Sequence, residues 1–141
     1  IAVAIMSGYL FSNIKHCFLI VLFSMLVTDF FLGFYNNMIF VYGSLFLITF
    51  IFYKISKKII LKNLFIYSFV GSVIFFIVSN FGVWALGSIA MNGIPYEKSL
   101  GGLIECYFYA IPFFGNTFIS TIIFSYSAFG ASYIFDKKIY N

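Results

Sequence analysis

Charged side chains are scarce in this sequence, and arginine is absent altogether. Only 9% of the 141 residues are charged, whereas soluble domains carry roughly a quarter. The mean hydropathy is +1.08, and runs such as CFLIVLFSMLV and LFLITFIFY lack the polar and apolar alternation of a membrane β-barrel. The sequence therefore predicts an all-α, polytopic transmembrane helix bundle that forms a single domain over residues 1–141.

Groups that catalyse reactions or bind metals are also few. The chain has four acids, one histidine and two cysteines, and Cys17 and Cys106 show no CxxC or Cys/His metal spacing. HExxH, GxSxG and a phosphate-binding glycine-rich loop are missing from the sequence. We therefore expect no enzyme activity, no cofactor and no metal. The lysines lie between hydrophobic runs and not on one polar face, which argues against a nucleic-acid partner.

Hydrophobic runs predict about five visible spans, at residues 1–13, 17–33, 38–53, 64–87 and 113–135. In the first span, Ala4 and Gly8 form a small-xxx-small face for close helix packing. The stretch GFYNN (33–37) predicts a turn. Residues 100–112 are apolar but only about 20 Å long as a helix. Because the sequence begins inside an apolar run, we expect that upstream sequence is missing and that the full-length protein has six spans.

Lysine clusters predict the orientation in the membrane. The stretch KISKKIILKN (54–63) carries four lysines, the strongest positive-inside signal in the chain. If residues 100–112 cross as a separate span, Lys137 and Lys138 lie on the opposite side from this loop. If that segment is re-entrant or interfacial, all lysine clusters lie in the cytoplasm. We favour the second arrangement, in a bacterial inner membrane with the lysine-rich loops cytoplasmic.

Two acids lie inside apolar segments. Asp29 is near the outer end of the second span, where a carboxylate costs about a few kcal/mol unless it faces protein or water. It is either a ligand-binding residue or a wet interfacial residue that bonds the GFYNN turn. Glu105 either binds a cationic or hydrogen-bonding ligand in a protein-lined cavity or pairs with Lys98 at the interface.

Other polar residues interrupt the later apolar segments. Asn80 and Trp84 are four residues apart, hence on one helix face, where an amide and an indole offer hydrogen bonds and stacking to a small ligand. Alternatively, Trp84 anchors its helix at the membrane interface. Pro112 and Asn116 flank the joint after residues 100–112; we interpret the proline as a turn residue and Asn116 as a partner for freed backbone groups.

Three blocks of the sequence match motifs of a known family: VTDFFLGFYNNMIFVYGS (27–44), SNFGVWALG (79–87) and GGLIECYFYAIPFFGNTFIS (101–120). They resemble an uncharacterised family of small bacterial integral membrane proteins, described only as candidate transport proteins. The resemblance covers most of the chain and implies a transport function. The chain departs from the family pattern at Thr28, where Ser is usual, at Tyr35, where His is frequent, and at Gly115, a position that is often basic.

More loosely, a Gly/Ala-rich helix, a short basic loop and a helix that ends in Asp-x-x-x-Gly are similar to the S components of energy-coupling factor transporters. That similarity implies capture of a micronutrient from outside, and docking to a transmembrane coupling subunit and ATPases. We expect a substrate-binding subunit for uptake of a small solute, with ligand-binding residues Asp29, Asn80, Trp84, Glu105 and Asn116. The alternative is a non-transporting membrane scaffold, in which the acids serve packing or bind a partner protein.

Overall fold

A computed structural model of the chain describes residues 1–55, 61–90 and 93–139, with side chains as far as residue 134. The described residues are mainly helical and contain no strand, only an isolated bridge between Ile89 and Pro95. The elements are α1 (Ala2–Leu10), α2 (Ile14–Leu32), α3 (Met38–Ile55), the 3-10 turn η2 (Leu61–Asn63), α4 (Leu64–Ala85) and α5 (Leu100–Ile139). The predicted all-α class is confirmed.

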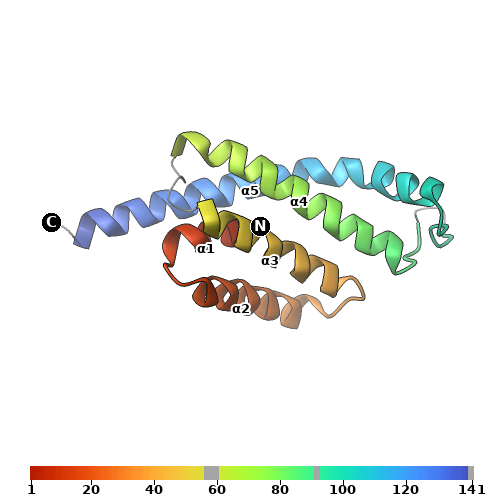
Figure 1. The fold of residues 1–141 in the computed structure, drawn as a ribbon, viewed down its shortest axis with the longest axis horizontal. Coiled ribbons are helices and arrows are strands. Elements are labelled where there is room, and N and C mark those ends of the chain that lie inside the picture. Colours follow the sequence, from red (N-terminus) through yellow and green to blue (C-terminus); the bar gives the residue numbers. More distant parts are fainter. Residues whose placement is uncertain (56–60, 91–92, 140–141) are drawn as a thin grey trace.

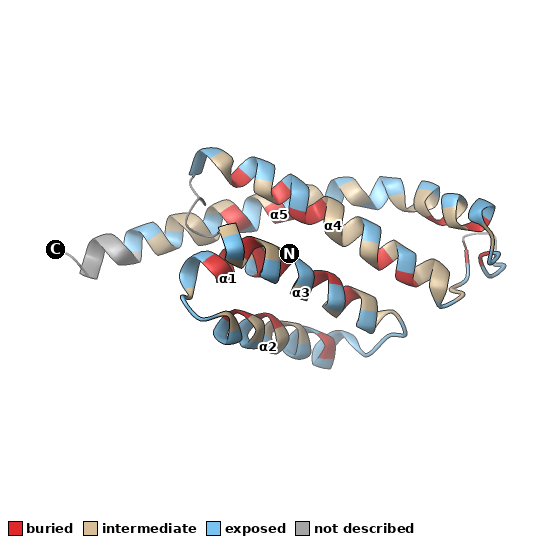
Figure 2. Ribbon diagram, viewed as in Figure 1, coloured by how far each residue is buried: buried red, intermediate tan, exposed pale blue. Residues whose placement is uncertain are grey.

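Four helices in the described part of the chain are long and apolar enough to cross a membrane: α2, α3, η2 with α4, and α5. Exposed residues alternate with buried ones along these helices (Figure 2). Phe31, Leu32 and Ile39 are each about four-fifths exposed, for example. A soluble protein rarely presents such an apolar surface, but lipid accommodates it. The first predicted span corresponds to α1, whose nine residues extend about 13 Å.

The four long helices form two antiparallel pairs. Figure 1 shows α4 and α5 running alongside each other, with α2 and α3 on one side of them. Helix α1 contacts all four of the others. Its buried side chains Ile5 and Met6 join a core with Ile48 and Phe52 of α3 and Leu64 of α4. A short helix thus fills the space between the two pairs.

Close packing between α1 and α3 depends on Gly8. A Cβ atom added at Gly8 would lie 2.7 Å from the Cα of Tyr53, which is closer than carbon atoms can approach. Ala4, one turn earlier, is buried. The predicted small-xxx-small face is confirmed, and the helix it contacts is α3.

Residues 100–112 do not form a separate re-entrant or interfacial helix, so that prediction is wrong. They are the first part of the 40-residue helix α5, which continues through Pro112. The Tyr107 hydroxyl donates to the Ile77 carbonyl over 2.7 Å, and Cys106 Sγ lies 3.5 Å from the Asn80 carbonyl. These contacts align the segment with the second half of α4. Proline removes one backbone donor, but packed membrane helices tolerate that loss.

Three of the lysines whose side chains are described lie at one end of the bundle. Lys15 is in the first turn of α2, Lys54 in the last turn of α3 and Lys62 in η2. Antiparallel packing against α4 carries the end of α5 to the same end. The other two lysines of the 54–62 loop lie outside the described residues, as do the side chains of the C-terminal pair. Lys98 lies at the opposite end, between α4 and α5.

Candidate ligand-binding site

Asp29 is a buried carboxylate near the end of α2. It is 3% exposed, and its Oδ2 accepts a hydrogen bond of 2.6 Å from the hydroxyl of Tyr42 on α3. Local geometry explains the pairing. Helix α2 ends at Gly33, whose φ of 95° suits glycine and whose N–H donates to the Asp29 carbonyl. The predicted turn at 33–37 is confirmed, and it returns the chain so that α3 runs antiparallel with Tyr42 level with Asp29.

A cavity of about 500 Å³ opens beside this carboxylate, between α2, α3 and α4. Its walls are mostly apolar and aromatic, and they include Phe34, Leu45 and Phe75. Thr28 and Tyr35 add hydroxyl groups. The volume is within the range of sites for small organic molecules, about 300–1,000 Å³. We call this space the Asp29 cavity.

Tyr35 lies on the turn that closes the Asp29 cavity, outside the helices. Burial raises the pKa of its phenol, and the nearby charge of Asp29 raises it further. Both effects disfavour the phenolate. The Tyr35 hydroxyl therefore stays protonated at neutral pH and is available as a hydrogen-bond donor.

Asn80 lines a different and smaller cavity of about 210 Å³ between α4 and α5. Its amide nitrogen donates to the Phe76 carbonyl of its own helix, over 2.8 Å. Phe75 lines both this cavity and the Asp29 cavity, so the two cavities are close to each other along α4. Helix α4 continues through Asn80 to Ala85, so Asn80 and Trp84 lie on one helix, as predicted.

Trp84 and Lys98 hold the loop between α4 and α5. The indole nitrogen of Trp84 donates to the Glu97 carbonyl over 2.8 Å. The Lys98 ammonium donates to the carbonyls of Trp84 and Ala85, the latter over 2.6 Å, and lies 5.3 Å from the centre of the Trp84 ring. Lysine at the end of a helix satisfies carbonyls that have no partner within the helix. We call these three residues, Trp84, Glu97 and Lys98, the Trp84 cluster.

The remaining predicted residues lie apart from the Asp29 cavity. Glu105 is half-buried on α5 beside Tyr96 and Cys106. The pKa of Tyr96 is raised mainly by burial, then by Cys106 and then by Glu105. Lys98, the partner considered for Glu105, donates to backbone carbonyls instead. Asn116 is exposed on α5. The structure therefore does not bring the five predicted residues together around one cavity.

Sequence reasoning missed Tyr42. The signal that could have found it is the turn at 33–37: two antiparallel helices joined by a short turn place residues at similar distances from the turn at the same level. Asp29 is four residues before Gly33, and Tyr42 is five residues after Asn37. Counting outward from the turn would have paired them.

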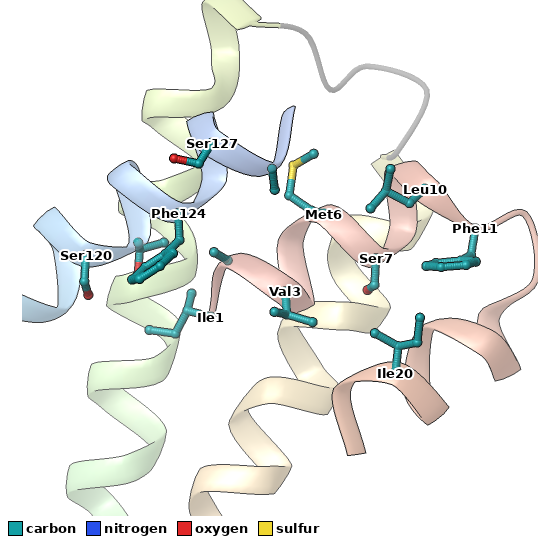
Figure 3. Close-up of a pocket in the computed structure, with 13 residues that line it drawn as sticks. Ile1, Val3, Met6, Ser7, Leu10, Phe11, Ile20, Ser120, Phe124 and Ser127 are labelled. Atoms are coloured by element: carbon teal, nitrogen blue, oxygen red, sulfur yellow. The ribbon is translucent and has the colours of Figure 1, made fainter. Parts of the chain in front are cut away.

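Another cavity, of about 580 Å³, lies between α1, α2 and α5. Figure 3 shows Val3, Met6 and Leu10 of α1, Ile20 of α2 and Phe124 of α5 around it. Hydroxyl groups of Ser7, Ser120 and Ser127 also line it, but no charged side chain does. Such a lining suits an acyl chain better than a polar solute, so the Asp29 cavity is the stronger candidate site.

Comparison with known proteins gives a family but no relative of known function. No curated protein and no solved structure matches the chain. A protein-family profile, in contrast, matches residues 1–141, which is the whole sequence. The chain therefore belongs to the family of unknown function DUF6580.

Proposed function

We propose that this protein is a membrane transport subunit that binds a small solute for uptake. The observation that carries the proposal is a carboxylate, Asp29, that is 3% exposed and lines a cavity of about 500 Å³ within helices of membrane-spanning length. An ionisable group inside an apolar membrane helix is unfavourable unless it faces protein or water, and such residues usually mark a path or site for a solute or ion.

The position of the Asp29 cavity supports uptake from outside. The cavity is next to the turn at 33–37, at the end of the bundle opposite Lys15, Lys54 and Lys62. Loops rich in lysine remain on the cytoplasmic side of membrane proteins. In a bacterial inner membrane, the cavity would then lie near the outer surface, where an uptake subunit meets its solute.

Uptake against a gradient requires a source of energy. The sequence contains no phosphate-binding glycine-rich loop of the kind that ATPases use. On the loose resemblance of the α1–α2 region to S components of energy-coupling factor transporters, we propose a transmembrane coupling subunit with ATPases as the source of that energy.

A scaffold without transport activity is the second candidate. It is favoured by the separation of the acids, since Asp29 lines one cavity and Glu105 lies beside Tyr96 and Cys106 on another part of the bundle. In that function Asp29 and Tyr42 would serve to pack α2 against α3.

Native mass spectrometry of the protein, purified gently from its own host, tests the proposal. We expect a co-purifying small molecule that is lost in Asp29→Asn. Glu105→Gln is the matched control, because it also neutralises an acid in an apolar segment, and it should keep the molecule. A protein that carries no solute and no ATPase partner in any detergent or growth medium would contradict uptake and favour the scaffold.

A further inference from the structure

Asp29 forms no ion pair with a lysine side chain among the described residues. Ile1 also lines the Asp29 cavity, but burial lowers the pKa of its α-amino group to about 6, so this group is mostly neutral at pH 7. Lys15, Lys54 and Lys62 lie at the opposite end of the bundle. Lys98 is bound to carbonyls at the end of α4. The carboxylate of Asp29 accepts its hydrogen bond from Tyr42, which is a neutral donor. The Asp29 cavity therefore has a negative charge in its wall that a bound solute can neutralise.

The charge of Asp29 discriminates between positively and negatively charged solutes. A buried carboxylate without a cation loses much of its hydration and gains little in return. A positively charged solute would restore a favourable interaction for Asp29, and the low polarity of the cavity walls would strengthen it. A carboxylate or phosphate on the solute would instead be repelled by the Asp29 carboxylate. No lysine among the described residues lies near enough to reduce this repulsion. The cavity therefore favours cations and rejects anions.

The remaining walls indicate that the cation is organic. Phe34, Tyr35 and Phe75 present aromatic rings to the cavity. Aromatic rings attract cations that carry apolar groups, and quaternary ammonium sites in proteins are commonly built from them. The volume of about 500 Å³ is far larger than an inorganic ion requires. In the part of the chain that the structure describes, no three His, Cys, Asp or Glu side chains gather as they would for a metal ion.

Building on the proposed function, we infer that the solute is an organic monocation with an apolar or aromatic body, such as a protonated amine or a quaternary ammonium compound. Asp29 binds its positive charge, with Tyr42 holding the carboxylate in place. The aromatic walls surround its apolar part. Tyr35 closes the site from the turn and donates a hydrogen bond where the solute has an acceptor.

Three probes of similar size and different charge test this inference. Benzyltrimethylammonium is a cation, benzyl alcohol is neutral and benzoate is an anion. Titration calorimetry in lipid nanodiscs compares their binding to the wild-type protein. We expect the cation to bind at least about tenfold more tightly than the other two, a difference of about 1.4 kcal/mol. In Asp29→Asn this preference should disappear, and in the matched control Glu105→Gln it should persist.

Several results would overturn the inference. These are equal binding of the neutral probe, tighter binding of benzoate, no binding of any probe, or a preference for the cation that survives in Asp29→Asn. Asp29→Glu keeps the charge, and it should keep the preference even if Asp29→Asn does not fold. The solute found by native mass spectrometry separates the two proposals. A neutral or anionic solute would contradict the cation and leave uptake standing, whereas a protein without any solute would contradict uptake itself.

Discussion

The Asp29 cavity and the Trp84 cluster look alike in the sequence and differ in the structure. Each has an ionisable or polar residue among aromatic side chains near the same end of the bundle. In the Trp84 cluster, however, the indole nitrogen and the lysine ammonium donate to backbone carbonyls. In the Asp29 cavity, the carboxylate has one neutral partner, Tyr42, and lies beside open space.

This difference separates structural polar groups from groups that can bind a ligand. A donor that already bonds backbone carbonyls at the end of a helix is not free to bond a solute, so removing it should lower stability. A charged group that faces a cavity without a counter-ion can still form a favourable interaction with a solute, so removing it should weaken binding. Mutations in the Trp84 cluster are therefore expected to lower stability and leave binding unchanged. Loss of the Asp29 charge is expected to lower affinity for the solute without lowering stability.

The largest effect is expected from Asp29→Asn. The amide has nearly the same shape but no charge, so affinity for the co-purified solute should fall about 100-fold, or about 2.7 kcal/mol. The melting temperature should stay the same or rise, because the mutation removes a buried charge that lacks a cationic partner. Equilibrium binding and thermal unfolding in nanodiscs measure the two effects. Unchanged affinity would contradict the site assignment.

Tyr42→Phe should have a smaller effect on binding. It removes the hydroxyl that donates to Asp29 and leaves a buried carboxylate with one hydrogen bond fewer, a cost of about 1–3 kcal/mol. We expect affinity to fall about tenfold and stability to fall as well. In the double variant with Asp29→Asn, the Tyr42 substitution should have little further effect on affinity, since the two residues act together. Additive losses would show that Tyr42 does not act through Asp29.

Lys98→Ala should destabilise the protein without affecting the solute. It removes the donor to the Trp84 and Ala85 carbonyls at the end of α4, and we expect a loss of about 1 kcal/mol in the free energy of unfolding. Affinity should remain within twofold or so of the wild type, because Lys98 lies outside the Asp29 cavity. Loss of solute binding in a folded Lys98→Ala protein would place the site at the Trp84 cluster.

The smallest effect is expected from Trp84→Phe. This change keeps an aromatic ring but removes the indole donor to the Glu97 carbonyl, a loss of about 0.5–1.5 kcal/mol. Hydrogen exchange of the loop between α4 and α5 should increase, while binding of the solute stays unchanged. If Trp84 stacks on the solute instead, affinity should fall and exchange in the loop should increase only in the solute-bound protein.

Features set by local sequence were predictable. Long apolar runs predicted the helices, GFYNN predicted the turn, and Ala4 with Gly8 predicted a close helix contact. Pro112 was misleading, because a proline that would end a helix in water can lie inside a packed membrane helix.

The candidate site was only partly predictable. Asp29 was predicted to bind a ligand because a carboxylate is rare in an apolar run, but the same reasoning applied equally to Glu105. Which acid lines a cavity depends on how helices distant in sequence pack together. Likewise, Asn80 and Trp84 were correctly placed on one helix, α4. Their hydrogen bonds to Phe76 and Glu97 depend on backbone geometry that periodicity does not describe.

The most direct test of the account is an experimental structure of the protein with its co-purified solute. We predict density for the solute between α2, α3 and α4, in contact with the carboxylate of Asp29 and the ring of Phe75. Density beside Trp84, or in the apolar cavity between α1, α2 and α5, with the Asp29 cavity empty, would contradict the assignment.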